Sequence, residues 1–412
     1  MSKRSASFIN AESLVGGVIV FLIILASDVG NVFGKILLDD YTSNYIGQAA
    51  FILSSIVSIP FIHKISYYYL NNWRLEDTLI FIYVFFVFLN KVLRNASTDL
   101  HIFPILELLF CFYIIPYFLR KIEEKIAFGI GIVGFIVITT VTILSILLSP
   151  SLLNWRGLLT FGMHPNAAAR DIFVLLISLY LISYILGVKR VTIKVFILFV
   201  SIGLIYLIIL TASFQVIIIG VLGSISIRKI YQKRLLANKK LESFYLKYGF
   251  TFVALPLLFI YIYESEVWIY VYQDQYSRII QYNTYLRYLY SNMSSYVISG
   301  QNISDLFRYN GENVRISGVA IGSPHNAILE VLLKYGFLSA VAYLSFHVKA
   351  LYEGIKIAKK TKSKLLIDIL SVSTVIFIIS LFDNFLPKLA GSISYVLYVM
   401  LGLLLNFARS IK

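Results

Sequence analysis

Long apolar runs recur along the whole chain, separated by short polar segments. An apolar run of about 18 residues or more can cross a lipid bilayer as a helix. Hydrophobic residues make up 59% of the 412 residues and charged residues only 14%, against about half and about a quarter in soluble domains. The runs therefore predict an all-α polytopic membrane protein.

Twelve transmembrane helices are predicted from these runs. They cover residues 14–37, 46–70, 77–93, 101–119, 126–149, 167–187, 191–212, 213–227, 249–263, 326–347, 366–385 and 390–408. Residues 1–412 are thus expected to form a single integral-membrane domain, with one large polar loop at 264–325 late in the chain. We expect no cleavable signal peptide, because no small-residue cleavage pattern follows the first run.

The net charge of +15 is distributed as expected for a membrane protein. With both termini cytoplasmic, 25 of the 36 Lys and Arg residues fall in cytoplasmic segments, which is the positive-inside pattern. The two densest basic segments, 228–248 and 349–364, have helical spacing and are expected along the anionic inner leaflet. No aromatic and basic platform accompanies the charge, so we exclude nucleic acid as a partner. The single cysteine, Cys111, lies in an apolar run and is expected to be a small core or lipid-facing residue.

Three polar features fall on the outer side in this topology. They are the turn at 162–170, the turn at 211–215 and the loop at 264–325. The loop is about 60 residues long, and loops of that length are usually functional or disordered. Its many Tyr residues argue against disorder. We therefore expect this loop to hold the site where a substrate is handled in water.

Two similar elements begin outward helices, His164-Pro165-Asn166 and Pro324-His325-Asn326. Proline favours the first turn of a helix, and asparagine caps it. The structural interpretation is a well-formed helix start. The functional interpretation is an anion site, because a helix N-terminus also binds anions. Both interpretations remain open for His164, Asn166 and Asn326.

Outward arginines give a sharper signal. Arg170, Arg278 and Arg287 carry planar, permanently charged groups that suit phosphate, although an arginine at a membrane boundary also snorkels without further function. They are candidates for binding a diphosphate at the membrane surface. Arg308 and Arg315 are expected to be solvated.

His325 is the candidate general base, because it lies where the loop returns to the bilayer and imidazole titrates near neutral pH. No Cys or His spacing for zinc is present, and the outward acidic residues form no recognisable metal cluster. We therefore expect metal-independent chemistry without a cofactor. Glu330 and Lys334, one turn apart in a predicted span, are expected to form a structural pair.

The segment Ser323-Pro-His-Asn-Ala-Ile-Leu-Glu-Val-Leu-Leu-Lys-Tyr-Gly-Phe-Leu-Ser339 resembles the exit of the large outward loop in the O-antigen polymerase and O-antigen ligase superfamily. Gly162-Met-His-Pro-Asn166 is similar to the Pro-Asn turn before a central span of that family. The resemblance covers about residues 161–385. In one departure, Phe214 stands where many members of the family carry an arginine.

The resemblance implies a membrane glycosyltransferase of the bacterial plasma (inner) membrane, acting at its outer face on a glycan carried by undecaprenyl diphosphate. It implies that His325 activates the acceptor hydroxyl, and that Arg278 or Arg287, with Arg170, holds the diphosphate. A chain-length regulator and a flippase of the same pathway are the expected protein partners.

The expected activity is polymerisation of O-antigen or capsule repeat units. The Tyr- and Asn-rich loop suits sugar stacking and hydrogen bonding. Two alternatives stay open. An O-antigen ligase would transfer the glycan to lipid A core. A lipid-linked oligosaccharide flippase, from another class, should show cations facing a central cavity and no long outward loop.

Overall fold

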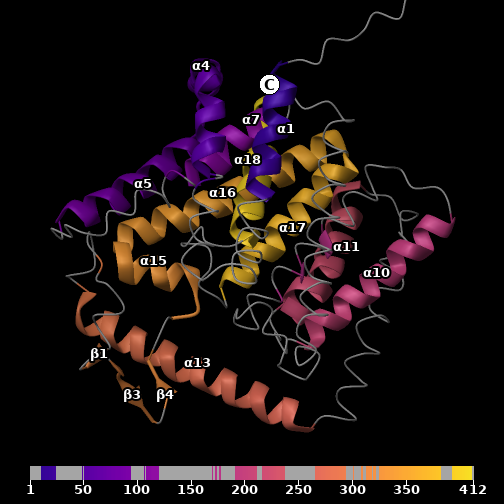
Figure 1. The fold of residues 1–412 in the computed structure, drawn as a ribbon. Coiled ribbons are helices and arrows are strands. Elements are labelled where there is room, and N and C mark those ends of the chain that lie inside the picture. The colour runs from indigo at the N-terminus through magenta and orange to yellow at the C-terminus, as the bar shows by residue number, and fades with distance from the viewer. Residues whose placement is uncertain are drawn as a thin grey trace, which may run out of the picture.

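The computed structural model is mostly helical, which agrees with the predicted all-α class (Figure 1). It describes residues 11–24, 51–93, 108–119, 191–210, 216–236, 265–293, 308–309, 312–317, 319–321, 324–381 and 392–410, with a few single positions between these ranges. The predicted spans at 126–149 and 249–263 lie outside the described residues. The number of membrane spans therefore stays a prediction.

The first half of the described chain contributes mainly single helices and two π-helical segments. These are α1 (Ala11–Ile24), the 3-10 turn η2 (Ile59–Phe61), α4 (Ile62–Asn71), α5 (Leu75–Leu93), the π-helix η3 (Phe110–Ile114), α7 (Ile115–Leu119), α10 (Val191–Leu210), the π-helix η6 (Val216–Leu222) and α11 (Gly223–Leu236). Within the described ranges one helix, Phe51–Asn71, is long and apolar enough to cross a membrane by its length and composition.

The second half supplies the centre of the molecule. It contains α13 (Ser265–Ser291), the strands β1 (Arg308–Tyr309), β2 (Glu312–Asn313), β3 (Arg315–Ile316) and β4 (Val319–Ala320), and the helices α15 (Ala327–Tyr335), α16 (Phe337–Thr361), α17 (Lys364–Ser380) and α18 (Ser392–Ser410). The strands form two small antiparallel hairpins, β1 with β2 and β3 with β4.

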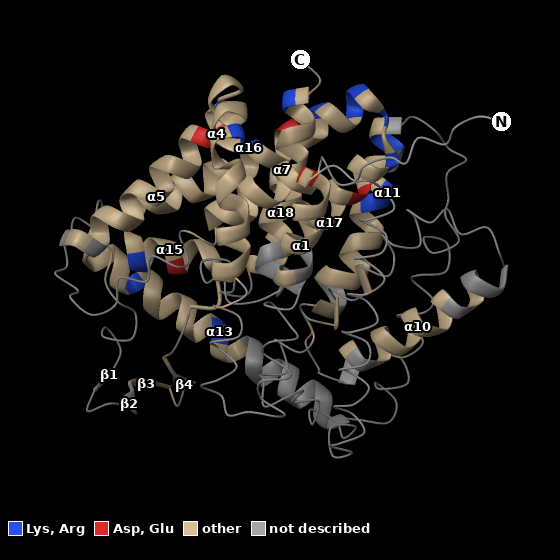
Figure 2. Cartoon of the chain, turned by 45° about the horizontal axis from the view of Figure 1, so that its top comes forward, with Lys and Arg blue, Asp and Glu red and all other residues tan. Residues whose placement is uncertain are grey.

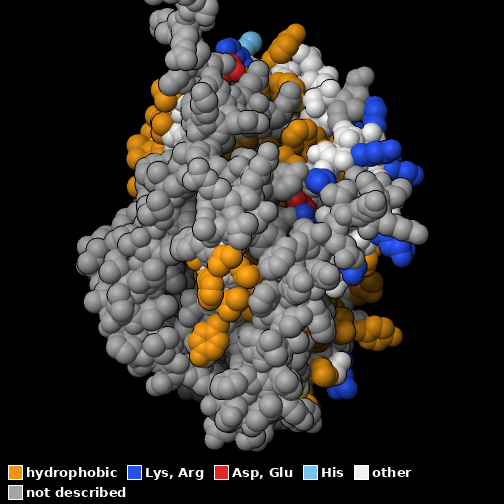
Figure 3. Space-filling model, turned by 90° about the vertical axis from the view of Figure 1, so that its right-hand side faces the viewer, with side chains coloured by type: hydrophobic (Ala, Val, Ile, Leu, Met, Phe, Trp, Pro, Cys, Tyr) orange, Lys and Arg blue, Asp and Glu red, His pale blue; other side chains and the backbone are white. Residues whose placement is uncertain are grey.

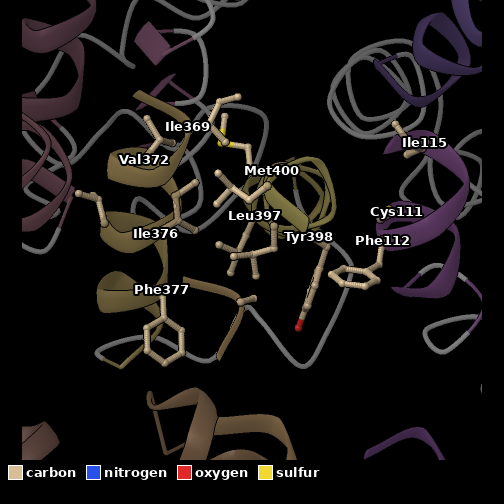
Figure 4. Close-up of a cluster of buried hydrophobic side chains, with 14 of the residues drawn as sticks. Cys111, Phe112, Ile115, Ile369, Val372, Ile376, Phe377, Leu397, Tyr398 and Met400 are labelled. Carbon is tan, nitrogen blue, oxygen red and sulfur yellow. The ribbon is translucent and has the colours of Figure 1, made fainter. Parts of the chain in front are cut away.

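Helix α18 lies in the middle of the apolar core. Figure 4 shows Leu397 and Tyr398 of α18 between Ile376 of α17 and Phe112 of η3. All four side chains are fully buried. Burial of apolar surface at about 25 cal/mol per Å² is the main contribution to stability in such a core, so α18 fixes α17 and η3 relative to each other.

Helices α5 and α16 pack side by side and run antiparallel, as contacts at both ends show. At one end Arg74, just before α5, forms an ion pair with Glu353 of α16 at 3.1 Å. At the other end Asn90 of α5 donates a hydrogen bond to the carbonyl of Lys334, near the end of α15 (2.5 Å).

The predicted span 326–347 is not one helix. Gly336 divides it into α15 and α16, and its φ of 88° lies in the left-handed region that glycine adopts without strain. The basic segment 349–364 is helical, in agreement with its spacing, and continues α16 without a break as far as Thr361. The break at Gly336 could not be seen in the apolar pattern, because helices adjoin the glycine on both sides and the apolar run continues through it.

Lys and Arg residues of α11, α16 and α18 gather at one end of the molecule, which we call the basic end, whereas those of α13 and α15 lie away from it (Figure 2). It contains the end of α4, the start of α5 and the ends of α11, α16 and α18. The described chain also begins and finishes there, with α1 and α18 (Figure 1). Two ion pairs join helices here: the buried pair of Arg409 with Asp77, between α18 and α5, at 2.5 Å, and the partly buried pair of Arg228 with Asp368, between α11 and α17, at 2.5 Å.

Candidate functional site

The segment expected as a long loop, 264–325, contains α13, a helix of 27 residues. This helix lies across the molecule at the end opposite the basic end (Figure 1). Every third or fourth residue along its C-terminal half is buried, namely Arg278, Gln281, Tyr285 and Leu289. That spacing defines one helix face. Tyr285 and Leu289 pack with Ile321 and Leu333, so the buried face of α13 lies against α15 and the residue after β4.

The two loop arginines lie on different faces of α13. Arg278 belongs to the buried face and is 5% exposed, whereas Arg287 is exposed to solvent. They are nine residues apart, which at 3.6 residues per turn is two and a half turns, so their side chains point in opposite directions. The structure therefore brings Arg278, and not Arg287, to the inner side of this helix.

His325 occupies the turn that precedes α15. Its φ of 46° is in the left-handed region, which few residues other than glycine adopt. The hydroxyl of Tyr282 on α13 donates a hydrogen bond to the His325 carbonyl at 2.9 Å. Arg278 lies one helical turn before Tyr282 on α13, on the same side of the helix. Sequence reasoning missed Tyr282, although its spacing from Arg278 was visible.

Asn326 is the N-cap of α15, as the sequence predicts. Its side-chain oxygen accepts a hydrogen bond from the amide of Leu329 at 2.9 Å. Its side-chain nitrogen donates to the carbonyl of Leu381, directly after α17, at 2.8 Å. The structural interpretation of Asn326 is therefore confirmed. The residue also fixes the start of α15 against the end of α17.

Glu330 and Lys334 form the predicted ion pair on α15. Glu330 is 1% exposed, and its negative charge disfavours the phenolate form of Tyr285 on α13. Burial and this carboxylate together raise the pKa of Tyr285 well above its usual value. Tyr285 is therefore a neutral hydroxyl at working pH.

Asn90 of α5 contacts both Gly300 and the end of α15. The side-chain oxygen of Asn90 accepts a hydrogen bond from the Gly300 amide at 3.1 Å, while its nitrogen donates to the Lys334 carbonyl. A Cβ at position 300 would overlap the backbone of residues 333–335, so only glycine fits. Sequence reasoning missed Asn90, although an asparagine within an apolar run is a signal that its side chain is hydrogen-bonded inside the protein.

The two hairpins were also missed. Asn310-Gly311 connects β1 with β2, and Ser317-Gly318 connects β3 with β4. Two-residue connections of this kind favour hairpins, and Asn-Gly is the strongest short signal for one. Arg315, in β3, is exposed, as expected. The hairpins place Ile321 against the buried face of α13.

Three of the predicted site residues, Arg170, His164 and Asn166, lie outside the described residues. Among the residues that are described, no group of three or more His, Cys, Asp or Glu side chains is arranged to hold a metal ion. The site that can be described thus consists of a guanidinium, an imidazole on a strained turn, and tyrosine hydroxyls. Such groups can bind an anion and transfer a proton.

The comparisons with known proteins give no family assignment: no family model matches this chain, and no curated protein matches it in sequence.

Proposed function

We propose that this protein is a polytopic membrane glycosyltransferase of the O-antigen polymerase and ligase superfamily. In this proposal it polymerises lipid-linked repeat units at the outer face of the bacterial plasma membrane. The observation that carries the proposal is the hydrogen bond from Tyr282 of α13 to the carbonyl of His325, in the turn before α15. This contact brings Arg278, suited to a diphosphate, within one helical turn of the residue that holds His325.

Two exposed apolar stripes support insertion into a bilayer. On α5 the stripe consists of Phe81, Phe85, Phe88 and Val92, and on α16 of Phe337, Val341, Leu344, Val348 and Tyr352. Both follow helical spacing, and the two helices are neighbours. Monomeric soluble proteins rarely expose contiguous apolar surface of this extent. Figure 3 shows further hydrophobic side chains exposed on another face, with Lys and Arg side chains along one edge of it.

The charge distribution supports the proposed orientation. Cations gather at the basic end, and α13 lies at the other end (Figures 1 and 2). Under the positive-inside rule the basic end faces the cytoplasm. The α13 end then faces outward, where a lipid-linked glycan would meet it. Trp73 and Tyr67, both exposed, lie near the basic end, as expected for aromatic side chains at a membrane–water boundary.

In the proposed reaction, the acceptor hydroxyl attacks the anomeric carbon of the donor sugar. His325 takes the hydroxyl proton, the new glycosidic C–O bond forms, and the bond from that carbon to undecaprenyl diphosphate breaks. The diphosphate leaves with the electron pair, and Arg278 stabilises its added negative charge. The proposal needs neither a metal nor a cofactor, and Arg287 has no part in it.

Complementation of a bacterial strain lacking this protein tests the proposal. Surface glycan would be compared on a gel for wild type, His325→Ala and Arg278→Ala at matched membrane expression. Arg287→Ala is the matched control, because it removes the same group from the opposite face of the same helix. We expect a ladder from wild type and Arg287→Ala, and at least about a hundredfold loss of polymer from the other two variants.

Other outcomes separate the alternatives. A single repeat unit on lipid A core from the mutants, with a ladder from wild type, identifies a polymerase. Loss of all transfer to lipid A core identifies a ligase. Lipid-linked units that accumulate on the inner side without the protein identify a flippase. A full ladder from both Arg278→Ala and His325→Ala would contradict the proposed site.

A further inference from the structure

Tyr282 lies on α13 at the point where this helix meets the His325 turn. We propose that Tyr282 is a positioning residue, whose hydrogen bond to the His325 carbonyl holds the imidazole in its reactive place. This inference rests on the function proposed above. It adds a residue that acts through the candidate base without itself contacting the reacting atoms.

The backbone of His325 is the first reason. A φ of 46° at a histidine is a sparsely populated conformation and persists where the surroundings determine it. Asn326 fixes the following side of the turn through Leu329 and Leu381. The hydroxyl of Tyr282 fixes the His325 carbonyl itself, at 2.9 Å, and does so from a separate helix. The bond restricts rotation about the φ of His325, on which the direction of the imidazole depends.

The arrangement of α13 is the second reason. Tyr282 is half-buried and follows the buried Arg278 by one turn. The bond joins α13, which carries Arg278, to the His325 turn, so it couples the position of the helix to that of the turn. In the proposed reaction the guanidinium and the imidazole serve the leaving diphosphate and the attacking hydroxyl of one reacting pair. A displacement of about 1 Å between such groups lowers turnover by up to about a hundredfold.

The test compares Tyr282→Phe with Tyr290→Phe. Tyr282→Phe removes one oxygen and keeps the ring. Tyr290→Phe makes the same change on the same helix at a side chain that is 86% exposed. Three measurements are made on the purified full chain. The first is polymerisation of lipid-linked repeat units, expressed as turnover and donor KM. The second is the rate at which diethyl pyrocarbonate modifies His325, followed by peptide mass spectrometry, and the third is the unfolding temperature.

For Tyr282→Phe we expect turnover about tenfold to a hundredfold lower, with donor KM within about twofold of wild type. We expect His325 to be modified at least about threefold faster, because its turn opens more often. The unfolding temperature should fall by less than about 3 °C. Tyr290→Phe should match wild type in every measurement.

An unchanged modification rate in Tyr282→Phe would overturn the inference, whatever the activity. A loss carried by KM alone would also overturn it, because Tyr282 would then bind substrate directly. If His325 is modified faster in Tyr282→Phe while wild type makes no polymer, the positioning role stands and the proposed function fails.

Discussion

Two residues in the turn before α15, His325 and Asn326, are held by hydrogen bonds to three different helices. His325 is fixed at its carbonyl by Tyr282, and the next residue, Asn326, makes one bond within α15 and another to the end of α17. Each such bond contributes about 1 kcal/mol net. Together they offset the strain of a left-handed histidine, which is on the order of 1–3 kcal/mol. A strained residue held in this way is typical of functional sites.

Gly300 gives a prediction at the residue scale. Gly300→Ala should lower the free energy of unfolding by about 1–3 kcal/mol, because the new Cβ overlaps the backbone of residues 333–335. Gly203→Ala in α10 is the matched control, since a Cβ there meets nothing within 4 Å. That change should stabilise the helix by about 0.5–1 kcal/mol. Thermal unfolding of the purified protein in detergent measures both. Equal stability of Gly300→Ala and wild type would contradict the close approach of Gly300 to the backbone of residues 333–335.

At the scale of single elements, helix α13 was hidden in the sequence. Its buried face carries Arg278 and Gln281 beside Tyr285, so polar residues stand where a hydrophobic pattern expects apolar ones. The amphipathic, Tyr-rich character of the stretch was visible, and so was the helix start at Asn326. Which arginine faces inward depends on how α13 is rotated about its axis. This could not be predicted for a stretch that was expected to be a loop.

The contact between α5 and α16 gives a prediction about pH. Glu353 of α16 has an 8% exposed side chain and lies 2.9 Å from Lys356, 3.1 Å from Lys349 and 3.1 Å from Arg74. Burial favours its neutral form, but the hydrogen bonds from Lys356 and Lys349 outweigh it and lower the pKa of Glu353 below its usual value.

A carboxylate with a lowered pKa stabilises the folded state above its unfolded pKa. The stability is lost as pH falls through the folded pKa. Glu353→Gln should therefore lower the free energy of unfolding by about 1–3 kcal/mol near pH 7. The difference from wild type should shrink below about pH 4.5. Unfolding followed between pH 7 and pH 3 measures this. Lys359→Gln, an exposed charge on the same helix, should leave the pH dependence unchanged, and a constant gap for Glu353→Gln would refute the explanation.

At the scale of the whole molecule, apolar runs predicted the helical class, and charge predicted which ends lie together. The runs near 77–93, 191–212, 366–385 and 390–408 coincide with α5, α10, α17 and α18. Helical spacing was visible in both basic segments, but composition could not predict where the helices that enter them end, because Lys and Arg are good helix formers. Helix α11 extends to Leu236 and α16 to Thr361 for this reason.

Orientation in the membrane can be tested by labelling single cysteines. In a Cys111→Ala background, which removes the one cysteine of the chain, we would introduce Tyr290→Cys on α13 and Lys359→Cys on α16. Both original side chains are exposed, one at the α13 end and the other at the basic end. A membrane-impermeant maleimide on intact spheroplasts should label Tyr290→Cys. It should reach Lys359→Cys only after the membrane is permeabilised.

A third variant, Phe85→Cys, reports on the apolar stripe of α5. Phe85 is 58% exposed, yet a cysteine there should stay unlabelled in spheroplasts and in permeabilised membranes, because lipid tails cover it. It should react only after solubilisation and unfolding. Labelling of Phe85→Cys from water would show that the stripe does not face lipid. If Lys359→Cys were the one labelled from outside, α13 would face the cytoplasm. Arg278 and His325 could then not act on a glycan at the outer face, and the proposed function would fail at the scale of the whole molecule even with the site intact.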